Sequence, residues 1–380
     1  MTGKSKRELL QELRPRYRQA TKSEKGRILA EFVAVTGYHR KYAIHLLKHG
    51  PPRPSPRRRA GQTPYNAAVV AALTDLWEQS GPLCGKRLWA FLPIWIESLE
   101  RHQQLSLEPG LQALLLSMSP ATIDRKLRAA GRRSPRRGLS TTRAGHLLKQ
   151  HIPVRTFADW DEARPGFTEI DRVAHCGDST RGEYLHTLNL VDIATGWSEF
   201  RAVTYRSQRD VFAALQTQRQ RLPFPLLGID SDNDGAFINA HLLRYCQAEQ
   251  LTFTRSRPNK KNDQAPIEQK NGSVIRRTIG YDRYEGDRAT RAFHALYDCL
   301  RLWVNFLQPS MKLVEKHRVG SRVRKTYDRP QTPYQRVLAS PQVSEADKQV
   351  LRDICQALNP LSLRRECDRR LEAVWQLAVR

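Results

Sequence analysis

The chain has 380 residues, and its 64 Lys and Arg against 38 Asp and Glu leave a formal net charge of +26. Such an excess of positive charge repels itself unless a polyanion is nearby, and nucleic acid is the obvious one. The sequence has no run of about 18 apolar residues and opens with a polar, basic stretch, which argues against a membrane span and a signal peptide. We therefore expect a soluble, cytoplasmic protein with two or three cores joined by linkers.

The N-terminal part, residues 1–50, has the pattern of a helix-turn-helix module. Residues 24–48 carry two apolar helical stripes around a turn that contains Gly37. Recognition helices contact base edges and phosphates near their start. In the second helix these positions are Tyr38, His39, Arg40 and Lys41. An ordinary αα-hairpin with a solvated basic face is the alternative interpretation.

A basic, proline-rich segment, residues 51–64, follows and is interpreted as an extended linker, because its prolines remove donors and fix φ. Helical periodicity returns in residues 65–150, where Ser119 and Pro120 have the residue types of an N-cap and a first helical position. This region is either a second helix-turn-helix or a plain helical packing module. A further basic stretch, 131–138, either follows DNA phosphates or is a solvated linker.

From residue 166 the pattern changes to that of strands. Three β-rich runs are followed by alternating helices and strands, and the order predicts an antiparallel meander extended by parallel strands through crossover helices. We therefore expect an α/β domain with a mixed sheet flanked by helices. The runs are 167–176, 183–197 and 198–205, then a helix at 207–220, a strand at 225–232, a helix at 236–249, a strand at 251–258 and a helix from about 264.

The last part, residues 311–380, begins with a basic arm rich in Lys and Arg. From Ser344 onward the pattern indicates two amphipathic helices, with Ser344 and Asp347 spaced as a helix-start cap. A tail that binds DNA or a partner and a structural cap on the core are both compatible with this segment.

Three acidic residues stand where the predicted elements could bring them together. Asp171 lies within the first β run, Asp232 ends an apolar strand, and Glu268 begins a helix. Strands disfavour Asp, and a buried carboxylate is costly without partners, so a function is favoured for Asp171 and Asp232. Glu268, taken alone, would be a surface glutamate of a helix, and only its spacing from Asp232 favours a function. Phosphoryl transfer on DNA uses two divalent cations about 4 Å apart, and such hard cations prefer carboxylate ligands.

Other residues compete for the same roles. Asp230 points to the same face of its strand as Asp232 and is an alternative to it. His175 could order a water or a phosphate, but a structural histidine is the favoured interpretation. Spacing does not select the remaining nearby acids, which are Glu169, Asp178 and Asp192.

The spacing of the three carboxylates resembles a known signature. Sixty residues separate Asp171 from Asp232, and 35 separate Asp232 from Glu268. This resembles the Asp, Asp, 35-residue spacer, Glu pattern of the retroviral-integrase (DDE) superfamily, which includes many bacterial insertion-sequence transposases. Ser231-Asp232-Asn233 followed by Phe237, and Asn262-Asp263-Gln264-Ala265 before Glu268, are similar to the family's motifs.

The resemblance covers about residues 165–310 and implies an RNase H-like integrase catalytic core with a mixed five-stranded sheet over 160–310. In that fold the first and fourth strands are adjacent, so that Asp171 and Asp232 would face one another while Glu268 reaches in from its helix. The three would hold two Mg²⁺ ions, or Mn²⁺ in their place. The implied reaction is metal-assisted attack on a phosphodiester by water and then by a DNA 3′-hydroxyl.

The implied function is that of a transposase, which performs DNA recombination and integration. Its partners would be the terminal inverted repeats of the element and target DNA, held by a homo-oligomer. The residues expected to contact this DNA before and along the catalytic helix are Arg255, Arg257, Lys260, Lys261, Lys270, Arg276 and Arg277. A solvated basic loop is the alternative for this group.

Two positions depart from the family pattern, and one structural module of retroviral integrases is missing. Asp234 stands where the family usually has Gly, and Pro266 lies two residues before Glu268, where it fits only if the helix begins nearby with Asp263 as its cap. The His-His-Cys-Cys zinc module of retroviral integrases is missing, because Cys84 is the one cysteine before Cys176. A catalytically impaired DNA-binding relative, a regulator or a degraded element, is therefore the alternative function, and an architectural protein that coats DNA is a second one.

Overall fold

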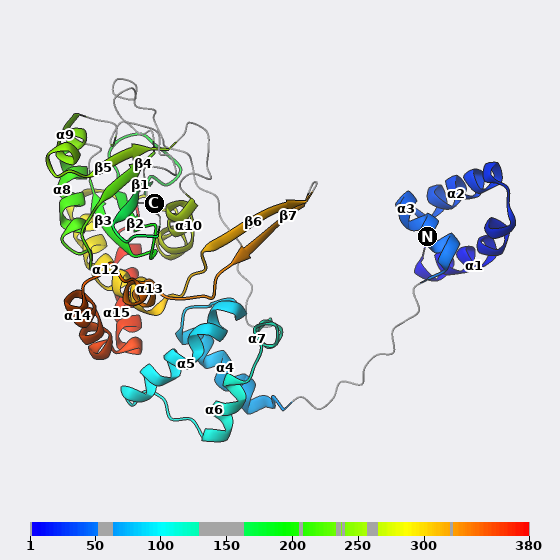
Figure 1. Cartoon of the computed structure of the whole chain (residues 1–380), viewed down its shortest axis with the longest axis horizontal. Coiled ribbons are helices and arrows are strands. Elements are labelled where there is room, and N and C mark those ends of the chain that lie inside the picture. The colour runs from blue at the N-terminus through cyan, green and yellow to red at the C-terminus, as the bar shows by residue number, and fades with distance from the viewer. Residues whose placement is uncertain are drawn as a thin grey trace. The chain divides into compact units, whose positions relative to one another are not determined.

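The computed structural model describes residues 2–51, 64–128, 163–204, 208–232, 237, 240–256, 265–319 and 322–379. The chain forms two compact units, Met1–Pro64 and Tyr65–Arg380 (Figure 1). Among the described residues, no helix is long and apolar enough to cross a membrane.

The first unit is a bundle of α1 (Gly3–Gln19), α2 (Lys22–Thr36) and α3 (Arg40–His49). A capping box between Thr21 and Glu24 begins α2, and Gly37, with φ of 68°, ends it in the left-handed conformation that glycine tolerates. The two helices expected around Gly37 are thus present. Helix α1 was not expected, and it contributes Leu10 and Tyr17 to a core that two short helices could not close by themselves.

The second unit begins with α4 (Ala67–Gln79), α5 (Gly85–Arg101), α6 (Pro109–Leu116) and α7 (Pro120–Leu127). The expected cap of α7 is confirmed, because the Ser119 hydroxyl accepts from the Thr122 N–H at 3.3 Å and Pro120 is the first helical residue. Side chains of these helices share one hydrophobic core with the sheet and the long C-terminal helices. This helical region is therefore part of the same compact unit as the sheet.

A mixed five-stranded sheet forms the centre of the second unit. Its strands are β1 (Phe167–Ala174), β2 (His186–Asp192), β3 (Ser198–Val203), β4 (Gly228–Ser231) and β5 (Thr252–Arg255), in the order β3-β2-β1-β4-β5. The first three pair antiparallel, and β4 and β5 run parallel to β1. The predicted fold class, a mixed five-stranded sheet flanked by helices, is confirmed, and β1 lies directly beside β4.

Helices cover both faces of this sheet (Figure 1). On one face Ile170 and Ile229 pack with residues of α8 (Gln208–Arg219) and α9 (Ala240–Ala248). On the other face Val173 and Phe200 join the core that contains α12 (Gly286–Leu307). Because successive strand residues point to opposite faces, Glu169 and Asp171 lie on the α12 side.

Three consecutive helical segments lie on this second face. They are α10 (Ala265–Lys270), a π-helical turn labelled η2 (Asn271–Arg276) and α11 (Arg277–Ile279). Because α10 begins at Ala265, Pro266 lies in its first turn, where its missing N–H has no intrahelical partner to lose. Asp263, the expected cap, lies outside the described residues.

After α12 the expected basic arm is an antiparallel hairpin, β6 (Leu313–Val319) and β7 (Arg322–Tyr327). The chain then forms α13 (Pro333–Ala339), α14 (Glu345–Ala357) and α15 (Pro360–Trp375). The two C-terminal helices and their cap are confirmed, since the Asp347 N–H donates to the Ser344 hydroxyl at 3.1 Å. The hairpin and α13 were not expected.

Candidate active site

The register between β1 and β4 determines which acidic residues face each other. Glu169 pairs with Asp230 in this parallel ladder, and Ile170 pairs with Ser231. The next pair along both chains is Asp171 and Asp232, just past the last residue of β4. With side chains alternating along a strand, all four carboxylates belong to the same face of the sheet. Asp171 and Asp232 are half-buried, whereas Glu169 and Asp230 are fully buried.

A chain of amide hydrogen bonds holds Asp171. Its Oδ2 accepts from Asn271 Nδ2 at 2.7 Å, and its Oδ1 accepts from the Arg172 N–H at 2.6 Å. Asn271 Oδ1 in turn accepts from Asn189 Nδ2 at 2.7 Å. Asn189 is the residue directly opposite Asp171 in the β1–β2 ladder. The carboxylate is thus fixed between its own sheet and the helical segment that follows Glu268.

The same helix is fastened to β1 at its beginning. The Ile267 N–H donates to Glu169 Oε2 at 3.0 Å, and Ile267 itself is fully buried. A carboxylate at a helix N-terminus is favourable, because the first N–H groups of a helix have no intrahelical acceptor. Glu268 is the next residue, is exposed, and lies three residues before Asn271. Residues three apart share a helix face, so Glu268 lies one turn from the contact with Asp171.

The competing acids have structural partners. Asp230 accepts from the Thr254 hydroxyl of β5 at 2.7 Å in the buried centre of the sheet. Asp192 accepts from the Gly166 N–H and from the N–H and hydroxyl of Thr195 at 2.6–2.8 Å, and burial raises the pKa of this carboxyl to about 6. Asp178 is exposed in a turn. Spacing along the sequence had not singled out Glu169 or Asn271, although Asn271 follows Glu268 by one helical turn.

His175 is a structural histidine, as favoured from the sequence. It is fully buried, and its Nε2 lies 2.7 Å from the Thr187 hydroxyl, which also bonds the Tyr297 hydroxyl. Burial holds the pKa of His175 well below its ordinary value, and the neighbouring Arg276 acts in the same direction.

The basic residues expected to contact DNA differ from one another in exposure and in hydrogen bonding. Arg255 is half-buried at the end of β5, opposite Ser231, and Arg277 is exposed. Arg276 donates to the Ala174 carbonyl at 2.7 Å, so part of its hydrogen-bonding capacity serves the fold. The three expected contacts that lie outside the described residues are Arg257, Lys260 and Lys261.

The side chain of Lys270 lies on a different side of the helix from Glu268. It follows Glu268 by two residues, which in a helix turns its side chain about 200° away. It lies near Arg87 of α5 and Arg336 of α13, and burial together with these two charges lowers the pKa of its amine to about 7. Lys270 is thus separated from the carboxylate face and belongs to a different basic region.

In the first unit the four expected contacts lie around the start of α3. His39 is the N-cap residue of α3, and its Nδ1 accepts from the Lys41 N–H at 3.4 Å. The Tyr38 ring packs edge-on against Tyr42, with centroids 5.2 Å apart. Arg40 and Lys41 are exposed.

No protein-family model matches the chain. The uncharacterized protein y4rM of Sinorhizobium fredii (strain NBRC 101917 / NGR234) is 46% identical over 331 residues, which span 87% of this chain and 94% of y4rM. The chain belongs to the y4rM family.

Solved structures similar to this member of the y4rM family include retroviral integrase cores. The catalytic core domain of BIV integrase is 15% identical, with a TM-score of 0.28, over 45% of this chain and 91% of that one. The HTLV-2 integrase catalytic core domain in complex with magnesium, in a dimeric form, is 13% identical, with a TM-score of 0.29, over 40% and 93%. The fold of this chain, a mixed five-stranded sheet flanked by helices, is assigned from its own strand order and β1–β4 register.

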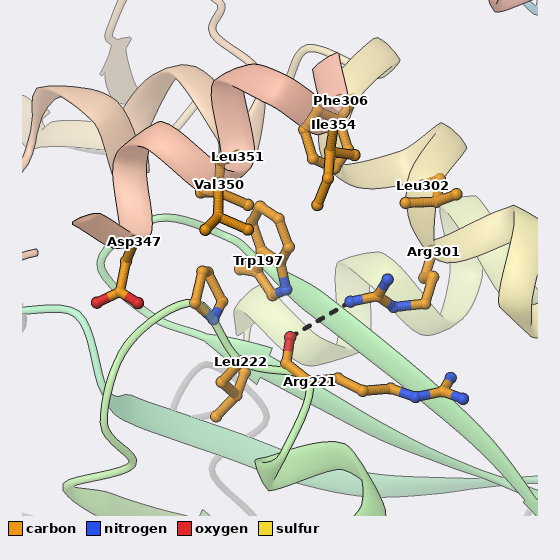
Figure 2. Close-up of a pocket in the computed structure, with 11 residues that line it drawn as sticks. Trp197, Arg221, Leu222, Arg301, Leu302, Phe306, Asp347, Val350, Leu351 and Ile354 are labelled. Atoms are coloured by element: carbon orange, nitrogen blue, oxygen red, sulfur yellow. Dashed lines mark hydrogen bonds between the residues drawn. The ribbon is translucent and has the colours of Figure 1, made fainter. Parts of the chain in front are cut away.

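This chain also has a crevice away from the carboxylates, with a volume of about 190 Å³ (Figure 2). It lies between α14 and α12, and its lining includes Trp197, Arg301 and Ile354. Arg301 bonds the buried Glu199 with both Nε and NH2 at 2.6 Å, and Trp197 Nε1 donates to the same carboxylate at 2.9 Å. These contacts join the long helix α12 to β3 and serve the packing of the C-terminal helices.

The carboxylates fit a hard divalent cation in their chemistry. Asp171 of β1 and Asp232, just past the end of β4, carry carboxylate oxygens, and Mg²⁺ prefers such ligands in small number, completed by water and phosphate oxygens. Within the part of the chain that the structure describes, no group of three or more His, Cys, Asp or Glu is close enough to hold a metal ion. The β1–β4 register brings Asp171 and Asp232 opposite each other. Glu268 lies on α10, which is fastened to β1.

Proposed function

We propose that the chain is a DNA transposase of the integrase (DDE) type, which cleaves DNA ends and joins them to a target. Asp171, Asp232 and Glu268 would be its catalytic metal ligands. The observation that carries the proposal is the parallel β1–β4 register, which aligns Asp171 with Asp232 on the face to which α10 is fastened.

The side chains around these ligands support the same chemistry. Mg²⁺, when bound by these carboxylates, would stabilise the charge that develops on the phosphate oxygens during attack by water or a 3′-hydroxyl. Asn271 would keep Asp171 in a fixed orientation, and Glu169 would hold the first turn of α10 so that Glu268 stays beside the sheet. Positioning of this kind is a large part of what an enzyme contributes to phosphoryl transfer.

Duplex DNA is the proposed partner. The net charge of +26 favours a polyanion, and the first unit presents the exposed Arg40 and Lys41 at the start of α3. In this proposal the first unit binds the terminal inverted repeats of the element, while the second unit performs the chemistry. Since two DNA ends must be held together for joining, we expect a homo-oligomer on DNA.

The test is end cleavage and strand transfer on DNA that carries the element's own termini, with Mg²⁺ or Mn²⁺. Asp232→Asn keeps the size of the side chain and removes its charge, and we expect activity to vanish while DNA binding persists. Asp178→Asn is the matched control, because Asp178 is exposed in a turn. Equal activity of the native chain and Asp232→Asn would contradict the proposal.

A catalytically impaired DNA-binding relative is the second candidate. It is favoured by the lack of a complete three-carboxylate cluster among the described residues and by Asp234, which stands where the resembling family has Gly. A native chain that binds DNA but never cuts it, with Mn²⁺ and after Asp234→Gly, would establish this candidate. Binding indifferent to end sequence, with no effect of carboxylate changes, would instead indicate an architectural protein.

A further inference from the structure

The β6–β7 hairpin presents both of its faces to solvent. Every side chain of residues 313–318 and 323–327 is exposed, including Val314 at 68% and Leu313 at 48%. Figure 1 shows the two strands extending as a ribbon from the second unit. Among the described residues no third strand pairs with it, and an isolated two-stranded hairpin is at best marginally stable in water. The hairpin therefore has the properties of an element that gains stability from something bound to it.

The base of the hairpin, in contrast, is firmly held. Asp328 accepts from the Lys312 N–H at 2.7 Å and donates its own N–H to the Lys312 carbonyl at 3.0 Å. Arg336 of α13 bonds Asp328 Oδ2 at 2.6 Å and the Ser310 carbonyl at 3.0 Å. An exposed ribbon on a fixed base keeps its direction relative to the second unit.

The charges on the ribbon identify what it can bind. Residues 313–327 contain five Lys and Arg and one acid, Glu315. Lys316 stands directly opposite Lys325, and His317 stands directly opposite Arg324. Like charges in directly opposed positions destabilise a sheet, so the Lys316–Lys325 pair weakens the ribbon unless negative charge lies against it. Arg318 shares the face of Lys316 and Lys325, because side chains alternate along a strand.

A further arginine stands at the base of the ribbon, where Arg336 holds Asp328. Only 10% of the Arg336 side chain is exposed, so the cations that can meet a ligand are those of the ribbon itself.

We propose that the β6–β7 hairpin is a DNA-binding ribbon, which lies in a groove of duplex DNA with Lys316, Arg318 and Lys325 toward the phosphates. The major groove admits a two-stranded β-ribbon, and phosphates supply the negative charge that the opposed cations lack. A second copy of this chain is disfavoured as the occupant, because pairing two such ribbons would bring their cations together. The proposal extends the proposed function and does not depend on it, since DNA binding here requires no cleavage.

The experiment measures binding of the full chain to a labelled duplex of arbitrary sequence by fluorescence anisotropy over a series of salt concentrations. Lys316→Gln, Arg318→Gln and Lys325→Gln are combined in one variant. We expect its Kd to rise about tenfold or more and the slope of log Kd against log salt to fall by about 2 to 3, one per lost phosphate contact.

The matched control removes three exposed arginines elsewhere, Arg288, Arg291 and Arg365, by substitution with Gln. Two of them lie in the first turns of α12, about 30 Å along this 22-residue helix from the end that leads to the hairpin. Net charge falls equally in both variants, so equal weakening would overturn the proposal. A charge-retaining variant, Lys316→Arg with Lys325→Arg, should bind as the native chain does.

Two further measurements separate this proposal from a dimer contact and from the proposed function. A hairpin variant that changes oligomeric state by light scattering but leaves DNA affinity unchanged would show that a second copy occupies the ribbon, and would overturn the proposal. Loss of cleavage in Asp232→Asn with an unchanged salt slope concerns the proposed function alone. The hairpin proposal stands or falls on the comparison of the two triple variants.

Discussion

Asn271 donates its side-chain amide to Asp171 at 2.7 Å from a position one helical turn after Glu268. This contact ties the carboxylate on β1 to the helix that carries the third acidic residue, and Asn189 extends it to β2. Asn271 therefore joins one proposed metal ligand to the helix that carries another, and its substitution tests the proposed site.

Asn271→Ala should reduce strand transfer about 10²-fold with little change in DNA affinity, because misplacement of reacting groups by about 1 Å can cost that much. Cleavage assays and anisotropy on the same preparations provide the measurement. Gln269→Ala is the control, since Gln269 is an exposed residue of the same helix. Equal activity of the two variants would show that Asn271 positions nothing of importance.

Glu169→Ala should destabilise the second unit by about 1 to 3 kcal/mol, since the buried Ile267 N–H would lose its acceptor. Glu169→Gln retains an acceptor oxygen and should cost less. Urea denaturation followed by circular dichroism gives the unfolding free energies of both variants. If Gln were as harmful as Ala, the negative charge at the helix start, rather than the hydrogen bond, would be what stabilises α10.

The buried His175 should make the unfolding free energy depend on pH. Its pKa is lowered in the fold, so the unfolded chain binds the extra proton first. Its contribution is fully present above the unfolded pKa of about 6.5 and is lost as the pH falls below that value, by at most about 1.4 kcal/mol per pH unit. His175→Gln should remove this part of the slope between pH 7 and 5, measured by denaturation at each pH. An unchanged slope would assign the dependence to other groups.

Gly85→Ala should destabilise the junction of α5 and α7 by about 1 to 3 kcal/mol, because an added Cβ would meet the Pro120 carbonyl and lie 2.7 Å from Asp124 Cγ. The Gly85 N–H also donates to Asp124 Oδ1 at 2.7 Å. Gly110→Ala in α6 is the matched control, since nothing lies within 4 Å of its added Cβ. Thermal melting should show a large loss for the first variant and little change for the second.

Several features of the fold followed from the sequence because they depend on neighbouring residues. Helix starts at Ser119 and Ser344 are set by a side chain that bonds an N–H three residues later. The turn at Gly37 needs a residue that tolerates positive φ. The spacing of Asp171, Asp232 and Glu268 drew attention to elements that the structure then placed beside one another.

Other features could not be recognised locally. The hairpin of residues 313–327 has no apolar face, so it lacks the alternation by which a half-buried strand is recognised, and cross-strand hydrogen bonds form it nonetheless. Lys270 was expected to contact DNA together with its sequence neighbours, and its positively charged neighbours in the fold, Arg87 and Arg336, are distant in sequence. Its place depends on which face of α10 the rest of the fold covers.

The sequence by itself determined the types and approximate positions of the five sheet strands and of the helices between them, and it singled out Asp171, Asp232 and Glu268. It did not predict α1, the β6–β7 hairpin or α13. Only the tertiary structure decided that Glu169 and Asn271 fasten α10 to the sheet and that Asp230 is used inside it. The physical reason is the separation along the chain over which each interaction acts. Caps, turns and side-chain alternation act over a few residues, whereas the partners of Asp171 and Glu169 lie about a hundred residues away and are selected by strand register and packing.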